Sequence, residues 1–270
     1  MLAQEFIRNA LVAGSAIAIA SGAVGYFVVL RAQVFAGDAL SHVAFTGVLA
    51  AALAGIDLRV GLFAATIAVA LLFAALGDRI RVDDAAIGVV FAWVLGLGVL
   101  FLYLFSRGSG GSNGAIAART LFGSIFSLSG HQTELAAVIA ALVVAGIAGI
   151  SRPLLFATIA PDSAAARGVP VGALGAAFLI LLAIDAAEAT QAVGALLLLG
   201  LIAAPAGAAM RLTAEPRLGL AISVAAALAS IWVGVALAYA APSLPPSSAI
   251  IGVAVAIYIA AFAATWGKAF

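Results

Sequence analysis

The chain has 270 residues, of which 66% are hydrophobic and only 9% are charged, and its formal net charge is +1. Soluble domains carry about 25% charged residues, so this composition excludes an ordinary soluble protein and indicates an integral membrane protein. The small net charge gives no reason to expect a nucleic-acid partner, and the absence of cysteine excludes disulfides and thiolate metal sites.

Apolar segments long enough to cross a bilayer follow one another along most of the chain. A membrane-spanning helix needs about 20 mainly apolar residues. We therefore predict an all-α, polytopic bundle of eight or nine transmembrane helices in a single domain, residues 1–270. The candidate spans are 10–30, 38–55, 60–77, 86–105, 134–151, 170–188, 191–211, 218–241 and 247–266. The second, third and sixth are short or interrupted, which leaves both counts open.

The second candidate span is interrupted by two ionisable side chains. Asp38 and His42 lie four residues apart, so on a helix they project from the same face. A carboxylate and an imidazole are normal ligands of zinc, manganese or iron, and an ionisable residue inside a membrane indicates a functional site. The alternative is a helix end, in which Gly37 marks a boundary, Asp38 is the N-cap and His42 hydrogen-bonds inside the bundle.

The longest polar stretch, 106–132, separates the fourth and fifth candidate spans. Its glycine- and serine-rich beginning is typical of a flexible loop, and its second half, 116–129, could lie on the surface or re-enter the membrane. We interpret His131 as a surface residue rather than a ligand. The sequence contains no Gly-x-x-x-x-Gly-Lys-Ser/Thr loop, so ATP-driven transport would need a separate ATPase chain.

Residues 152–169, between two candidate spans, carry the signals of a short helix. Pro161 and Asp162 are typical of a helix start, and Gly168 is typical of a helix end. This helix could dock on a cytoplasmic partner, or the segment could be an ordinary surface loop with one helical turn. A nine-span arrangement puts it on the side with more basic residues, which favours the cytoplasm. Those residues are Arg31, Arg79, Arg81, Arg152, Arg167, Arg211, Arg217 and Lys268, against Arg8, Arg59, Arg107 and Arg119 on the other side.

Two further acids, Asp185 and Glu188, lie near the end of the sixth candidate span. Their i, i+3 spacing allows them to share a helix face. At the outer membrane boundary they would raise the local concentration of cations, whereas deeper in the bundle they would be additional metal ligands. We favour the boundary.

With these residues identified, the chain resembles the ABC-type manganese/zinc/iron permease family, the membrane subunits of bacterial metal importers. The string Gly-Asp-Ala-Leu-Ser-His at 37–42 is the most specific match. The matching stretches are 25–31, 35–42, 82–88, 193–212 and 244–250. The chain departs from the family at 43–47, where Val-Ala-Phe-Thr-Gly replaces the usual Ala-Leu-Pro-Gly, so the helix break caused by that proline is not implied here.

The resemblance implies a homodimeric or paired permease, two cytoplasmic ABC ATPase subunits and an extracytoplasmic metal-binding protein at a bacterial inner membrane. It implies that Asp38 and His42 are metal ligands on the permeation path and that 152–169 is the coupling helix that contacts the ATPase. Such a chain is a transport subunit rather than an enzyme. It holds no permanent cofactor, and its cargo is divalent zinc, manganese or iron.

Two residues do not fill a metal's coordination shell. We expect waters, carbonyl groups near Gly37 and Gly47, or the same residues of a second copy to complete it, with Asp185 and Glu188 as weaker candidate ligands. Two rival functions remain. One is a proton- or sodium-coupled secondary transporter that uses Asp38, Asp185 and Glu188. The other is an ABC permease for a metal chelate, although such permeases tend to be longer.

Overall fold

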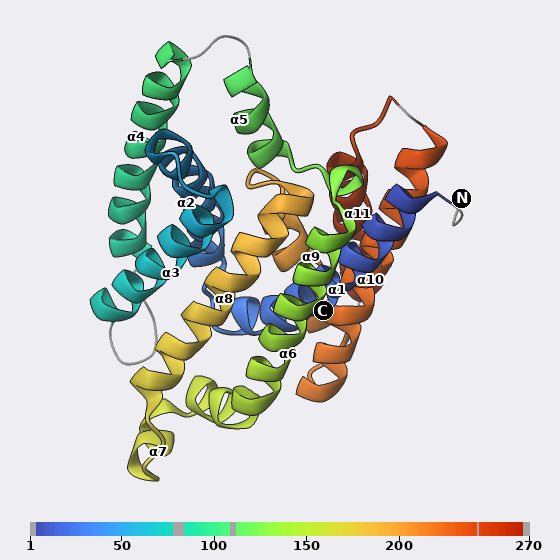
Figure 1. The fold of residues 1–270 in the computed structure, drawn as a ribbon. Helices are drawn as coiled ribbons and strands as arrows, with labels where there is room; N and C mark the ends of the chain where they lie inside the picture. Colours follow the sequence, from blue (N-terminus) through green and yellow to red (C-terminus); the bar gives the residue numbers. More distant parts are fainter. Residues whose placement is uncertain (1–3, 78–83, 109–111, 242, 267–270) are drawn as a thin grey trace.

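The computed structural model describes residues 4–77, 84–108, 112–241 and 243–266, which form a bundle of helices (Figure 1). The elements are α1 (Glu5–Leu30), α2 (Val34–Ala54), α3 (Leu58–Leu76), α4 (Asp84–Gly108), α5 (Ser112–Phe122), the 3-10 turn η1 (Ile125–Ser127), α6 (Gly130–Ile159), α7 (Pro161–Ala166), α8 (Val171–Val193), α9 (Leu198–Leu212), α10 (Pro216–Ala240) and α11 (Pro246–Trp266). Within the described ranges, eight helices are long and apolar enough to cross a membrane. The predicted all-α bundle is confirmed, whereas Arg79, Arg81 and Lys268 lie outside the described residues.

The segment from 170 to 212 differs from the two complete spans predicted there. α8 continues to Val193 and ends at Gly194, whose φ is 94°, and α9 begins only at Leu198. α9 has 15 residues. At 1.5 Å per residue it is about 22 Å long, less than the roughly 30 Å of a bilayer core. The predicted span at 191–211 is therefore wrong as a full crossing, because apolar composition continues across a break that Gly194 introduces.

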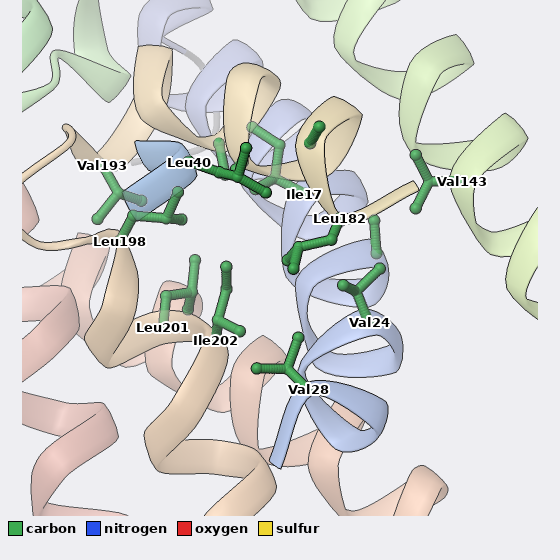
Figure 2. Close-up of a cluster of buried hydrophobic side chains, with 14 of the residues drawn as sticks. Ile17, Val24, Val28, Leu40, Val143, Leu182, Val193, Leu198, Leu201 and Ile202 are labelled. Atoms are coloured by element: carbon green, nitrogen blue, oxygen red, sulfur yellow. The ribbon is translucent and has the colours of Figure 1, made fainter. Parts of the chain in front are cut away.

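The centre of the bundle lies around α1, which packs against α6, α8, α9 and α10. Small residues let these helices approach closely, as is usual in membrane bundles. Figure 2 shows the larger apolar side chains that fill this centre. They are Ile17, Val24 and Val28 of α1, Leu40 of α2, Val143 of α6, Leu182 and Val193 of α8, and Leu198, Leu201 and Ile202 of α9.

The chain between α4 and α6 folds onto the break between α8 and α9. The amide of Ala195 donates to the Thr120 carbonyl at 3.1 Å, and the amide of Ser124 donates to the Gln191 carbonyl at 3.3 Å. Gly123 lies at this contact with φ 71°, where an added Cβ would be 2.3 Å from the Val193 carbonyl carbon. Residues 116–129 are thus packed against the transmembrane helices, and their backbone satisfies groups that the break exposes.

The opposite end of the bundle carries α7, which Figure 1 shows projecting below the ends of α6 and α8. α7 starts with Pro161 at its first turn, and Gly168, with φ 80°, follows its end. The predicted short helix and its start and stop signals are confirmed. However, residues 152–159 belong to α6, which continues through Pro153 to Ile159. Only the part from Ala160 onward lies between the two membrane helices.

Close packing at Gly25 gives a test of the central contacts. A Cβ added there would lie 2.2 Å from the Ile202 carbonyl oxygen, so Gly25→Ala must push α1 away from α9. We expect a loss of about 1–3 kcal/mol in the free energy of unfolding, as for other overpacked cores. Gly96→Ala is the control, because no atom lies within 4 Å of a Cβ added there. Thermal unfolding in detergent should show Gly25→Ala destabilised and Gly96→Ala unchanged or more stable. Equal stability of the two variants would contradict this account of the packing.

Candidate metal centre

α2 carries both predicted ligands well inside a continuous helix. It begins at Val34, and its N-cap is Gln33 rather than Asp38, so the helix-end interpretation of Asp38 and Gly37 is wrong. Asp38 and His42 are both half-buried, and their four-residue spacing puts them on one face of the helix. A carboxylate and an imidazole are therefore presented together from one rigid element.

Aromatic and aliphatic side chains surround this face of α2. The ring of Phe91, on α4, lies 5.3 Å from the His42 ring between centroids, and it also makes an edge contact with Phe35 at 5.9 Å. On the α8 side, Leu182 Cδ1 is 3.8 Å from the position of a Cβ on Gly37. These apolar contacts and the partial burial of the pair exclude some of the water, so the attraction between a cation and the carboxylate is stronger than in bulk solvent.

Hydrogen bonds attach α2 to two of its neighbours at and just after the ligand pair. Ser41 is fully buried, and its hydroxyl lies 3.0 Å from the Ala195 carbonyl oxygen, one of the groups in the break between α8 and α9. The hydroxyl of Thr46 lies 3.2 Å from the Val94 carbonyl oxygen of α4 and 3.4 Å from that of His42. These contacts fix the rotation of α2 about its own axis, and so the direction in which Asp38 and His42 point.

Thr46 occupies the position of the proline in the family pattern. α2 is unbroken from Val34 to Ala54, so no proline-type break follows His42. Gly37 and Gly47 both lie inside this helix, where each carbonyl oxygen accepts a hydrogen bond from the next turn. The expectation that carbonyl groups freed near these glycines serve as ligands is not supported.

Asp185 and Glu188 do not join Asp38 and His42. Among the described residues, no group of three or more His, Cys, Asp or Glu side chains is arranged to hold a metal ion. The chain by itself thus offers two candidate protein ligands on α2, and an ion bound there would need further donors to reach four or six.

Glu188 is paired with a residue that the sequence analysis did not select. Arg59 Nη2 lies 2.7 and 2.8 Å from the two carboxylate oxygens, and the Gln191 amide donates to the same carboxylate at 3.1 Å. Only 4% of Glu188 is exposed. A charge that is both buried and balanced does little to attract cations from solution, so the preferred interpretation of an acid at an open boundary does not fit Glu188. The available signal in the sequence was Arg59 itself, because a lone arginine at the start of an apolar helix often pairs with a buried acid on another helix.

Asp185 faces a different helix. The Ser21 hydroxyl of α1 donates to its Oδ1 at 3.2 Å, and Oδ2 is buried with no hydrogen-bond partner among the described residues. Only 3% of Asp185 is exposed. The two acids thus share α8 but contact α1 and α3 respectively, and neither lies at an open boundary.

A pocket of about 340 Å³ lies beside the Arg59–Glu188 pair. Its lining includes Arg59 and Gln191 together with polar residues of α5, η1 and the first turn of α6. These elements are at the end of the bundle away from α7 (Figure 1). His131, in the same first turn of α6, is exposed, which confirms its assignment to the surface.

Comparisons with known proteins agree with this architecture. The model of the ABC 3 transport family matches residues 3–265. The "Probable iron transport system membrane protein" of Haemophilus influenzae is 30% identical over 87% of this chain and 85% of its own length. The manganese transport system membrane protein MntC of Listeria monocytogenes is 27% identical over 97% of this chain and 91% of its own length. PsaBC from Streptococcus pneumoniae, solved in complex with Fab, superposes with a TM-score of 0.82 at 24% identity, covering 96% of this chain and 91% of that one.

The Arg59–Glu188 pair predicts a pattern of stabilities. Glu188→Gln leaves the Arg59 charge without its counterion, which we expect to cost about 2–3 kcal/mol of unfolding free energy. The cost is below that of a fully buried pair because the Arg59 side chain is 22% exposed. The double change Arg59→Met with Glu188→Met should recover most of this loss, because it removes both charges together. Thermal unfolding of the two variants in detergent measures the difference, and a double variant less stable than Glu188→Gln would contradict it.

Proposed function

The chain belongs to the ABC 3 transport family, and from this membership and the geometry of α2 we propose that it is the permease subunit of an ATP-driven importer of divalent transition metal ions. The supporting observation is the pair Asp38 and His42, half-buried on one face of an apolar helix. Family members named for the transport of manganese and of iron support a metal as cargo. Zinc stays within the proposal because the same two donors suit all three metals.

The ligand pair needs a second source of donors, and we propose that a second copy of the chain supplies it together with water. Asp38 and His42 are not completely covered by the chain's own helices. α3 and α4, which pack on either side of α2, bury only about a fifth of their apolar segments. An ionisable pair is costly against lipid, so covering it with another permease copy satisfies both the metal and the membrane. The assembly would lie in a bacterial inner membrane.

We also propose that α7 docks on the cytoplasmic ATPase. The sequence has no phosphate-binding loop of its own, so the energy of ATP must enter through a contact with another chain. α7 projects from one end of the bundle and exposes Asp162, Ser163, Ala165 and Ala166, while Ala164 is buried against α6 and α8. The polar pocket at the opposite end, around Arg59 and Gln191, would then face the extracytoplasmic metal-binding protein.

The ligand assignment is tested by uptake of Mn²⁺, Fe²⁺ and Zn²⁺ into cells or proteoliposomes. Asp38→Ala and His42→Ala should each abolish uptake of the transported metal and weaken its binding by more than the roughly 10–100-fold that loss of an outer-shell partner costs. His131→Ala, which removes an exposed histidine, is the control and should transport normally. Transport at the unmodified rate by either ligand variant, at equal amounts in the membrane, would refute the site. Uptake of a metal chelate but of no free ion would instead favour the chelate permease.

The docking of α7 is tested by cysteine crosslinking, which the absence of native cysteine makes clean. A cysteine at the exposed position Ala166 should crosslink to the ATPase subunit. Ala164→Cys should crosslink poorly, because that position is fully buried in the permease. Labelling of Ala166→Cys only from the extracytoplasmic side would show that α7 lies on the other side of the membrane and would overturn the assignment.

A further inference from the structure

Arg31 is a charged side chain that is almost completely buried, with 1% of its surface exposed. It follows the last residue of α1 and begins the turn into α2. A buried guanidinium is costly unless its donors are matched by several acceptors. The contacts of Arg31 therefore show which helices this side chain connects.

Among the described residues, those contacts include partners on three helices besides α1. Nε donates to the side-chain oxygen of Gln33 at 3.2 Å, and Gln33 is the N-cap of α2. Nη1 donates to the hydroxyl of Thr158 at 3.1 Å, in the last turn of α6. The guanidinium carbon lies 5.4 Å from the centre of the Phe178 ring on α8, a cation–π distance.

Thr158 lies in the last turn of α6, next to α7 in the chain. Only Ala160 separates α6 from α7, and Ala157, Ala164 and Val171 form one buried cluster across the end of α6, α7 and the start of α8. We call this unit, Phe156 to Leu174, the α7 corner. Because α7 is packed into it on two sides, a displacement of α7 carries Thr158 with it.

The turn from α1 to α2, which leads to the ligand pair, is tight. Ala32 has φ 53°, and the Gln33 amide donates to the Val28 carbonyl at 2.8 Å, so the turn has little slack. α2 then continues unbroken past Asp38 and His42. A shift of Gln33 along or about the axis of α2 is therefore passed to both ligands.

We propose that Arg31 is a positioning residue that links the α7 corner to α2, so that the movement of α7 on the ATPase changes the placement of Asp38 and His42. This inference rests on the proposed docking of α7. Arg31 touches no cargo itself. It acts through the planar fork of its guanidinium, which holds Thr158 with one nitrogen and the N-cap of α2 with another.

The experiment uses the complete transporter, permease with its ATPase, in proteoliposomes, and measures metal imported per ATP hydrolysed. Arg31→Lys keeps the charge but cannot hold both partners in the same fork. It should lower this ratio by about fivefold or more, the usual scale of coupling between two sites. Thr158→Val keeps the shape but removes the acceptor, and should lower the ratio in the same direction. Arg8→Gln, at the exposed start of α1, is the control and should leave the ratio unchanged.

Two readouts separate this role from a purely structural one. The double variant Arg31→Lys with Thr158→Val should lower the ratio no further than the single changes do, because both act on one contact. The Ala166→Cys crosslink to the ATPase and metal binding at Asp38 and His42 should persist in each variant.

A ratio unchanged in both single variants, with the crosslink retained, would overturn the role of Arg31. Loss of the crosslink in the otherwise unmodified chain would instead overturn the docking of α7. The milder Thr158→Val keeps the test decisive if Arg31→Lys fails to fold.

Discussion

The break between α8 and α9 frees backbone groups inside a bundle of membrane helices, and each of them needs a hydrogen-bond partner from the protein. Lipid offers no hydrogen bonds, so buried groups left unsatisfied would cost several kcal/mol each. The segment from α5 to η1 meets this requirement from one side, with Thr120 and Ser124 bonding across Gly123 and Gly194. Ser41 of α2 meets it from the other side at the Ala195 carbonyl. The helix that carries Asp38 and His42 is thus oriented by the same contacts that satisfy the break.

The sequence was sufficient to predict the features that depend on the spacing of nearby residues and on the length of apolar segments. The i, i+4 spacing of Asp38 and His42 puts them on one face of any helix, and the start and stop residues of α7 act within one or two turns. The break at Gly194 could not be seen this way, because Leu196, Leu197 and Leu198 keep the segment as apolar as a full span. From the neighbouring residues alone, a glycine that allows close helix packing cannot be distinguished from one that breaks a helix with a positive φ.

Contacts between charged residues and partners far away in the chain could not be predicted from the sequence either. Glu188 and Arg59 are 129 residues apart, and Arg31 meets Thr158 across 127 residues, so no periodicity relates them. Burial does predict that such partners exist, because a charge inside a membrane bundle needs a counter-charge or a set of donors. It does not say which helix provides them. That choice follows from how α1, α3, α6 and α8 pack.

The unbroken course of α2 has a consequence for how cargo is released. In the proposed site, a carboxylate and an imidazole one turn apart on a straight helix would form a bidentate chelate, whose geometry does not change when the helix tilts or rotates as a whole. The intrinsic affinity of this half of the coordination shell would therefore be nearly the same on both sides of the membrane. Strong binding in one state and weak binding in the other must come from donors that α2 does not carry. The free-energy difference that drives release would then come from the remaining donors, which bind the ion in one state and leave it in the other. Asp38 and His42 would stay at a fixed spacing in both states.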